Sequence, residues 1–427
     1  MSEIEKYLIE KGFLYPSNSI YGKLENSWDY GHLGVLLKNN LKQAWIDYFV
    51  TKSSNVLLYE GNILTSREIW EASGHLKNFE KELIECKNCN KRYEVEQQLL
   101  NKCKYCGSSE FSEAKKFQLI FKTDKYYLRP ETAQTIFANI KLISLNSKLN
   151  LPFSVAQIGK SFRNEVTPEK TIFRTKEFEQ LEFEEFTFPE KAEETLKQQV
   201  EQIKKFLVEK LEFPTSSFSF ESVPKGELPH YSLQNYDLHY NFEFGREELW
   251  GIANRGNYDL SSHQEYSGEK LHFQIEDNSK VILPHVIEHS LGLNRLMLAL
   301  INEKLLNIGN KKWKTLSLPI FLSPYKFAVL PLTKEQLKDA NKLFSYLQKF
   351  SFSVILSHKG SIGKRYREQD EIGTPYCLTV DFESGNWEAL SFSLTLRKRD
   401  SGEQIRITKE KLRDYILLAL NVSKELW

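Results

Sequence analysis

Long apolar runs are missing from this sequence. No stretch approaches the ~20 apolar residues that a membrane-spanning helix requires, and the first residues lack the apolar core of a secretion signal. We therefore expect a cytoplasmic protein without a membrane partner. A strong excess of charge of one sign is also absent, because the formal net charge is +1. A polyanionic partner would therefore have to bind local basic patches rather than follow a global field.

Three clusters of basic residues are candidates for such patches. They are Lys311-Lys312 with Lys314, Lys364-Arg365 with Arg367, and Arg397-Lys398-Arg399. Each cluster fits contacts to nucleic-acid phosphates and equally fits a solvated surface.

Cysteine is scarce, with five residues in the chain, and this excludes a disulfide framework. Four of the five form two pairs, Cys86-x-x-Cys89 and Cys103-x-x-Cys106. Two such knuckles supply four thiolates for a tetrahedral, structural Zn²⁺ site. A redox pair is the alternative, but no flanking β-α-β pattern supports it. Cys377 lies in an expected buried strand, where we interpret it as a packing residue.

The length of 427 residues, with 41% hydrophobic and 27% charged residues, is typical of a globular protein of two or three domains. Residues 33–49 have the pattern of an amphipathic helix, and residues 80–116 form a polar insertion that contains the cysteine pairs. Short aromatic-rich alternating runs between 117 and 189 indicate antiparallel strands. Beyond about residue 322, strands and helices alternate, which predicts a separate α/β domain with a largely parallel sheet.

The segment from 162 to 186 has the pattern of a hairpin with a long tip. It brings together Arg163, Glu165, Arg174 and Phe178. Arginine binds phosphate in a bidentate manner, a carboxylate accepts from an exocyclic amine, and an aromatic ring stacks on a purine. These three properties together match ATP. A surface hairpin with cross-strand ion pairs is the alternative.

Three further segments combine charge with special backbone positions. Leu128–Gln134 presents Glu131 after a proline-fixed turn, where this carboxylate fits a ligand contact and equally fits a helix cap. Glu247–Arg255 offers a carboxylate for Mg²⁺ beside an arginine for a substrate carboxylate. The third, Val286–Arg295, contains Gly292 at the expected start of an apolar helix, residues 291–300, a place that suits an anion.

Taken together, these segments resemble the class II aminoacyl-tRNA synthetases, specifically the homodimeric glycyl-tRNA synthetases. The resemblance covers nearly the whole chain. It is carried by Tyr30–Asn40, Ala72–His75, Arg129–Gln134, the 162–186 hairpin, Gly292–Arg295, Gly360–Tyr366 and Asp370–Pro375. It implies an α+β fold with an antiparallel catalytic sheet at 1–315, including the four-cysteine zinc-binding insertion at 80–116, and an α/β anticodon-binding domain at 316–427.

The resemblance also implies an activity, its partners and the roles of individual residues. The activity is ATP-dependent ligation of glycine to tRNA(Gly) through glycyl-adenylate by a homodimer, with Mg²⁺ accompanying ATP. The implied catalytic residues are Arg163, Arg174 and Arg295. The implied ATP-binding set is Arg163, Asn164, Glu165, Phe173, Arg174, Phe178, Glu248, Leu249, Gly292 and Arg295. The implied glycine-binding set is Glu131, Phe178, Glu182, Arg255, Glu288 and Ser290. The implied metal ligands are Cys86, Cys89, Cys103 and Cys106 for zinc, and Glu248 and Glu288 for magnesium.

Some positions depart from the family pattern. Histidine stands at 32 and 289 where proline is usual, and asparagine at 257 and 294 where aspartate is usual. Glu94 reverses the charge of an arginine that usually lies near the substrate. Because the phosphate-binding arginines are all present, we expect an active enzyme. Two rivals are a non-catalytic nucleic-acid-binding protein on the same scaffold and a synthetase for another small amino acid.

Overall fold

The computed structural model describes residues 2–24, 27–95, 102–165, 170–274 and 281–420. The chain divides into two compact units. The larger comprises Pro16–Trp28 and Trp45–Leu298, and the smaller comprises Met1–Tyr15, Asp29–Ala44 and Ala299–Trp427. Among the described residues, no helix combines the length and the apolar character needed to cross a bilayer.

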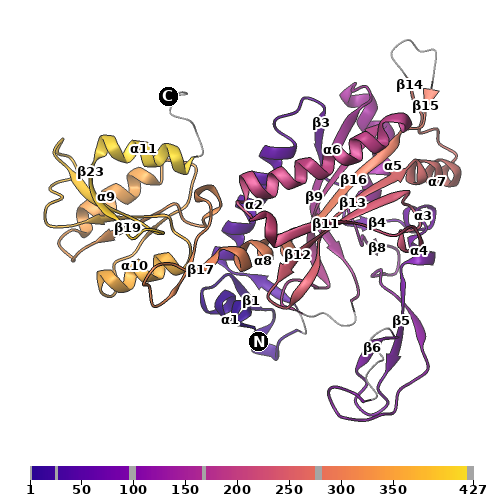
Figure 1. Cartoon of the computed structure of the whole chain (residues 1–427), viewed down its shortest axis with the longest axis horizontal. Helices are drawn as coiled ribbons and strands as arrows, with labels where there is room; N and C mark the ends of the chain where they lie inside the picture. The colour runs from indigo at the N-terminus through magenta and orange to yellow at the C-terminus, as the bar shows by residue number, and fades with distance from the viewer. Residues whose placement is uncertain (1, 25–26, 96–101, 166–169, 275–280, 421–427) are drawn as a thin grey trace. The chain divides into compact units, whose positions relative to one another are not determined.

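A seven-stranded sheet forms the centre of the larger unit (Figure 1), in the order β11-β12-β13-β16-β10-β9-β3. The strands are β3 (Val56–Tyr59), β9 (Phe153–Phe162), β10 (Glu177–Thr187), β11 (Phe218–Ser222), β12 (Gln234–Phe242), β13 (Gly245–Gly256) and β16 (His285–Gly292). All neighbours are antiparallel except β3, which runs parallel to β9. The expected antiparallel sheet is thus a mixed one, because β3 reaches β9 through a long crossover, as parallel pairing demands.

The predicted hairpin is present as β9 and β10, paired from Phe162↔Glu177 to Phe153↔Phe186. Part of its tip, residues 166–169, lies outside the described residues. Successive side chains of β10 point to opposite faces of the sheet. Glu182 and Glu184 therefore share one face, while Phe183 points to the other and stacks on His289 with ring centroids 4.7 Å apart.

An aromatic layer covers the Phe183 face. It is formed by Trp45, Phe49, Phe183, Phe206, Trp250 and His289. The first two come from the end of α2 (His32–Phe49), and α6 (Ala192–Lys205) lies across the same face (Figure 1). Burial lowers the pKa of His289 to about 3, so this histidine is a neutral packing residue here.

The opposite face is apolar at one end and polar at the other. Helices α5 (Ala133–Ser147) and α7 (Tyr258–Ser267) pack their apolar residues on Phe153 and Phe186. Further along β10, Glu184, Glu182 and Gln180 replace these aromatics on the same face. The sheet thereby places carboxylates beside a hydrophobic core, in an environment that changes their pKa values.

Helix α8 (Leu293–Lys304) begins directly after β16. The sequence predicted a helix over residues 291–300, but Leu291 and Gly292 are the last residues of the strand. Leu291 still pairs with Leu181 and Trp250, and this pairing extends the strand to the point where α8 starts.

The cysteine-bearing insertion forms a small sheet in the order β6-β5-β7. These strands are β5 (Glu80–Glu85), β6 (Arg92–Glu94) and β7 (Lys115–Gln118). Other short elements of the larger unit include β4 (Leu64–Thr65), β8 (Tyr127–Leu128), α3 (Arg67–Ala72), α4 (His75–Asn78), β14 (Phe273–Gln274) and β15 (Val281–Ile282).

The smaller unit contains a five-stranded sheet in the order β20-β19-β21-β22-β23. Its main elements are β19 (Phe327–Pro331), α9 (Leu337–Leu347), β20 (Val354–Leu356), α10 (Ile362–Glu371), β21 (Tyr376–Val380), β22 (Ser393–Lys398), β23 (Gln404–Thr408) and α11 (Lys409–Ala419), with β17 (Leu305–Asn307) paired to β18 (Lys314–Leu316). The first three strands are parallel, as predicted, while β22 and β23 add an antiparallel hairpin. The sheet is therefore mixed rather than largely parallel.

Helix α1 (Glu3–Glu10), at the start of the chain, packs within this smaller unit. The Tyr7 hydroxyl donates to the backbone oxygen of Glu371 at 2.7 Å, and Lys11 Nζ lies 2.6 Å from the Glu371 carboxylate. Asn40, in α2, donates to the backbone oxygen of Leu322 at 3.0 Å. Segments from both ends of the sequence thus complete one unit.

Three arginines of the expected basic patches are buried in this unit, which corrects their interpretation as phosphate contacts. Arg397 forms a bidentate pair with Asp370 at 2.7 and 2.9 Å. Arg365 donates to backbone oxygens, including that of Pro331, and Arg399 to those of Gly373 and Leu318. These guanidinium groups stabilise the fold of the smaller unit. Among the three clusters, the exposed side chains include Lys364 and Arg367, whereas Lys398 is half-buried.

Candidate active site

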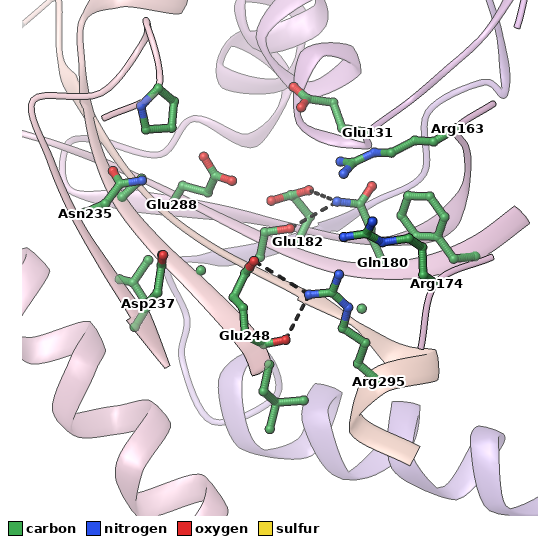
Figure 2. A pocket seen from close by; sticks show the side chains of 18 of the residues that line it. Glu131, Arg163, Arg174, Gln180, Glu182, Asn235, Asp237, Glu248, Glu288 and Arg295 are labelled. Atoms are coloured by element: carbon green, nitrogen blue, oxygen red, sulfur yellow. Dashed lines mark hydrogen bonds and ion pairs between the residues drawn. The ribbon is translucent and has the colours of Figure 1, made fainter. Parts of the chain in front are cut away.

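A cavity of about 500 Å³ opens over the polar end of the central sheet (Figure 2). Thirteen of the predicted ATP- and glycine-binding residues line it: Glu131, Arg163, Glu165, Phe173, Arg174, Phe178, Glu182, Glu248, Leu249, Glu288, Ser290, Gly292 and Arg295. Asn164 and Arg255 do not. The structure therefore brings together residues that are up to 164 positions apart (295 − 131).

Three arginines gather on one side of the cavity in Figure 2. The Nε of Arg163 donates to the backbone oxygen of Pro130 at 3.0 Å, and its guanidinium group lies 5.2 Å from the ring centroids of both Phe79 and Phe178. Arg295 donates to the backbone oxygen of Glu248 at 2.9 Å. These contacts fix the guanidinium planes before any ligand arrives.

Carboxylates occupy the middle and the opposite side. Burial raises the pKa of Glu182 well above its usual value, and the nearby Glu288 and Glu131 raise it further. Glu184, deeper on the same face, shows the same direction of pKa shift for the same first cause, and the carboxylates of Glu182, Glu184 and Glu288 meet within 4.8 Å. Burial and mutual repulsion therefore favour the protonated forms of these carboxyl groups, and a cation placed beside them would favour their ionised forms.

Glu131 differs from these glutamates. Burial by itself raises the pKa of its carboxyl group, but His75, Arg255 and Arg163 together hold that pKa well below the usual range. The cavity therefore contains one carboxyl group whose pKa is lowered beside others whose pKa values are raised. A single ammonium group is a suitable partner for such an arrangement.

Arg255 lies behind the cavity wall and is almost fully buried. Its guanidinium group forms two hydrogen bonds to Asp259, at 2.7 and 2.9 Å, and an ion pair with Glu288. Burial by itself lowers the pKa of Arg255, but these carboxylates outweigh it and raise that pKa well above its usual value. Arg255 therefore orients Glu288, and the contact with a substrate carboxylate predicted for it stays a prediction.

Asp237 lines the cavity near Glu248 (Figure 2), and sequence reasoning missed it. Burial raises its pKa to about 6, with a further contribution from the Glu248 carboxylate. The sequence did contain an indication. Polar Asn235 and Asp237 alternate with Tyr236 and Leu238, which places both polar residues on one face of β12.

The insertion also contributes to the cavity, through Lys81 of β5. Lys81 Nζ lies 2.7 Å from the carboxylate of Glu94 and 3.7 Å from that of Glu165. Glu94 in turn lies 3.7 Å from Arg174. The unusual glutamate at position 94 thus faces two cations, and Lys81 supplies a positive charge at this side of the cavity.

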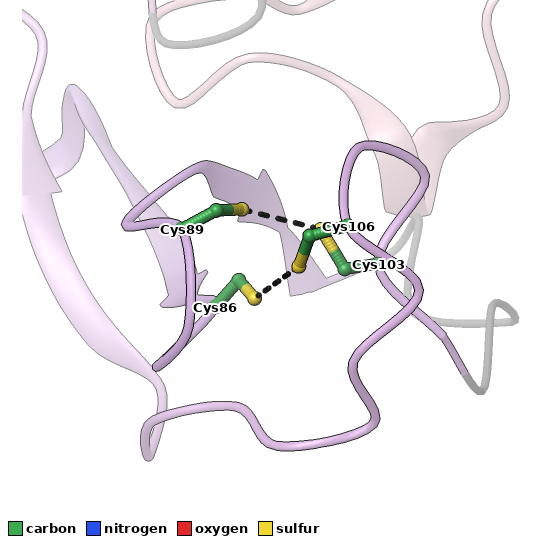
Figure 3. A group of neighbouring side chains, drawn as sticks. All are labelled: Cys86, Cys89, Cys103 and Cys106. Carbon is green, nitrogen blue, oxygen red and sulfur yellow. Dashed lines mark hydrogen bonds between the residues drawn. The ribbon is translucent and has the colours of Figure 1, made fainter.

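The four cysteines of the insertion converge at a second, separate site (Figure 3). The Sγ atoms of Cys86 and Cys106 are 3.6 Å apart, and those of Cys89 and Cys103 are 3.5 Å apart. A disulfide requires about 2.05 Å, whereas four thiolates around zinc at about 2.3 Å are roughly 3.8 Å apart. Burial opposes ionisation of Cys103, but hydrogen bonds from Tyr93 and backbone N–H groups lower its pKa to about 6. The donors fit a tetrahedral metal ion.

Comparison with known proteins agrees with this geometry. Residues 117–304 match the family described as tRNA synthetase class II core domain (G, H, P, S and T), and residues 326–418 match the family described as Anticodon binding domain. The chain is 40% identical to a Glycine--tRNA ligase of Mesoplasma florum, over 97% of this chain and 99% of that protein. It is also 40% identical to a Glycine--tRNA ligase of Geobacillus kaustophilus, over 97% of this chain and 98% of the relative.

Proposed function

We propose, on the premise that this chain belongs to the Glycine--tRNA ligase family of class II tRNA synthetases, that the cavity over the central sheet activates glycine with ATP. The enzyme then joins glycine to tRNA(Gly), the reaction that defines the family. One observation carries the assignment of the site: three arginines and a group of glutamates line a single cavity (Figure 2).

The arginine side is the proposed ATP site. Attack by the glycine carboxylate on the α-phosphorus builds negative charge on the phosphoryl oxygens, and a fixed guanidinium group stabilises that charge in the transition state. Arg163 is proposed for this role, while Arg174 and Arg295 are proposed to bind the outer phosphates. Glu165 and Phe178 are proposed to recognise the adenine. No general base is required because the attacking carboxylate is already ionised.

The glutamate side is the proposed glycine site. The ionised Glu131 receives the ammonium group, and Glu182, Glu288 and Ser290 enclose it. Larger amino acids are rejected because a side chain would have to displace these groups. No smaller amino acid competes, so we expect no editing site.

The assignment is tested by amino-acid-dependent exchange of pyrophosphate into ATP, measured with each amino acid in turn. We expect exchange with glycine and none above background with alanine or serine. Exchange with another amino acid would indicate a different specificity. Exchange with no amino acid at all would favour a non-catalytic nucleic-acid-binding protein.

Mg²⁺, which class II synthetases use with ATP, prefers oxygen ligands. Of the two glutamates predicted to bind it, Glu288 lies in the carboxylate cluster and is paired with Arg255, whereas Glu248 lines the cavity near Asp237. We propose Glu248 as the main protein ligand, with Asp237 beside it. The ion would neutralise phosphate charge there.

This proposal predicts a pH dependence. The Asp237 carboxyl, whose pKa is raised to about 6, is charged above that pH and becomes protonated as the pH falls through it. One pH unit below its pKa only about a tenth of an acid is ionised, so we expect the KM for MgATP to rise up to about tenfold between pH 7.5 and 5. Asp237→Asn should remove most of this dependence. Glu247→Gln, a change on the neighbouring strand outside the cavity, should retain it.

The four cysteines are proposed to bind one structural Zn²⁺, since they leave no open coordination position. Elemental analysis of the purified protein should give about one zinc per chain. The double variant Cys86→Ser/Cys89→Ser should lose the metal and keep part of its glycine exchange, because none of the cysteines lines the cavity. Cys377→Ser, in the smaller unit, should retain the metal. A metal-free wild-type protein would contradict the site.

The remaining expectations are also proposals. The domain boundary is kept at 315/316, with residues 316–427 binding the anticodon of tRNA(Gly). Exposed cations such as Lys364 and Arg367 are better candidates for phosphate contacts than the buried arginines of the same unit. A homodimer in the cytoplasm is the proposed state.

A further inference from the structure

A buried histidine lies directly behind the ionised glutamate of the cavity. His75 is 3% exposed, and its Nε2 is 3.1 Å from one carboxylate oxygen of Glu131. Its other ring nitrogen, Nδ1, is 2.8 Å from the hydroxyl oxygen of Ser73. Glu131 lines the cavity, whereas His75 does not. A chain of contacts therefore runs from Ser73 through the imidazole to a carboxylate that faces the substrate space.

The local backbone holds this imidazole in place. Gly74 has φ of +78°, and a Cβ there would lie 3.1 Å from the Tyr258 hydroxyl and 3.2 Å from His230 Nε2. The imidazole ring packs edge to face against Trp70, with centroids 5.3 Å apart. Both the turn and the ring thus have little freedom to move, and the direction of Nε2 is set before any ligand binds.

The geometry also fixes where a proton must lie. A bare nitrogen lone pair 3.1 Å from an ionised oxygen would be repelled, so Nε2 carries hydrogen and donates to Glu131. The Ser73 hydroxyl can accept from Nδ1 or donate to it, and either arrangement leaves Nε2–H on the carboxylate. The second oxygen of Glu131 accepts from Gln134 Nε2 at 3.2 Å. Both oxygens are therefore oriented by protein donors.

We propose that His75 is a positioning residue for the substrate ammonium group, holding the Glu131 carboxylate in the orientation that receives it. The proposal rests on the assignment of Glu131 to glycine binding. It gives a role to the Ala72–His75 segment, whose similarity to glycine enzymes was visible in the sequence without any function attached. His75 touches no substrate and acts through Glu131.

Two substitutions distinguish the roles of the two ring nitrogens of His75. The side-chain amide nitrogen of glutamine can take the place of Nε2, whereas that of asparagine takes the place of Nδ1. Loss of a donor to a buried charged group corresponds to about a ten- to hundredfold change in affinity. We expect His75→Asn to raise the KM for glycine by that factor, with the KM for ATP changed by less than about twofold. His75→Gln should recover most of the lost affinity. Equal effects of the two variants would overturn the proposal.

His230 provides the matched control. Its Nε2 lies 3.2 Å from the backbone oxygen of Ser73, so it supports the same turn without contacting Glu131. His230→Asn should leave the KM for glycine within about twofold of wild type. If it raises that KM as much as His75→Asn does, His75 merely supports the turn and the proposal is wrong.

A milder variant gives an independent result if His75→Asn fails to fold. Ser73→Ala deletes one hydroxyl and leaves the imidazole, so we expect a severalfold rise in the KM for glycine; an unchanged value would refute the proposed chain. The wild-type assay distinguishes a failure of the proposed function from a failure of the proposed role of His75. Absence of glycine-dependent exchange in the wild type overturns the proposed function, whereas normal exchange with no effect in the position-75 and position-73 variants overturns only the role of His75.

Discussion

Replacing Arg163 with alanine should lower the rate of glycine-dependent pyrophosphate exchange by at least about a hundredfold, the usual effect of removing a donor that stabilises transition-state charge. The effect should be large because the guanidinium group is fixed beforehand. Its Nε is held by the backbone oxygen of Pro130, and its plane lies near the rings of Phe79 and Phe178. The rate constant at saturating ATP and glycine is the quantity to measure.

A matched control for this prediction is Arg92→Ala. Like Arg163, Arg92 lies near an aromatic ring, that of Phe117. It forms an ion pair with Glu85 at 2.9 Å and lies outside the cavity. Exchange by the Arg92 variant should match the wild type. Phe178→Ala should mainly raise the KM for ATP. Near-normal exchange by Arg163→Ala would remove the basis of the mechanism.

The second large effect concerns stability. Arg255→Leu should lower the free energy of unfolding by about 3–5 kcal/mol, because removing one partner of a buried ion pair leaves its carboxylates uncompensated. Here two carboxylates, of Asp259 and Glu288, would lose their cation. Arg255→Lys should recover only part of this stability, since an ammonium group cannot reproduce the forked contacts to Asp259. Urea unfolding of the full chain measures the change.

Arg246, on the same strand, is the control for this experiment. It pairs with Glu221 at the sheet surface, and both side chains are nearly half exposed. Exposed pairs contribute about 0–1 kcal/mol, so Arg246→Leu should have little effect. Comparable losses in the two variants would show that the Arg255 pairing is no more important than a surface contact.

Local patterns in the sequence predicted much of the larger unit. Alternation predicted the β9–β10 hairpin, and helical periodicity predicted α2 almost to its first residue. The spacing of the cysteine pairs predicted that four thiolates would meet. In each case the relevant residues lie in one continuous stretch of the sequence, so a local pattern can reveal the feature.

Features that depend on distant partners escaped prediction. The sequence around Arg397 is typical of a surface cation. In the structure Arg397 is buried and pairs with Asp370, which lies 27 positions away. The place of Lys81 beside Glu165 depends on how the insertion lies against the hairpin. The sequence did not indicate that β3 pairs with β9, because parallel strands are not joined by a short turn.

The composition of the smaller unit has a consequence for how the chain folds during synthesis. Residues 1–15 and 29–44 leave the ribosome well before residues 299–427, with which they form one unit. At ordinary translation rates of about 5–20 residues per second, the contact between Tyr7 and Glu371 must wait on the order of tens of seconds. During that interval the seven-stranded sheet can form, while Tyr7 and Lys11 still lack their contacts with Glu371. The smaller unit is therefore completed only after the whole larger unit has been synthesised.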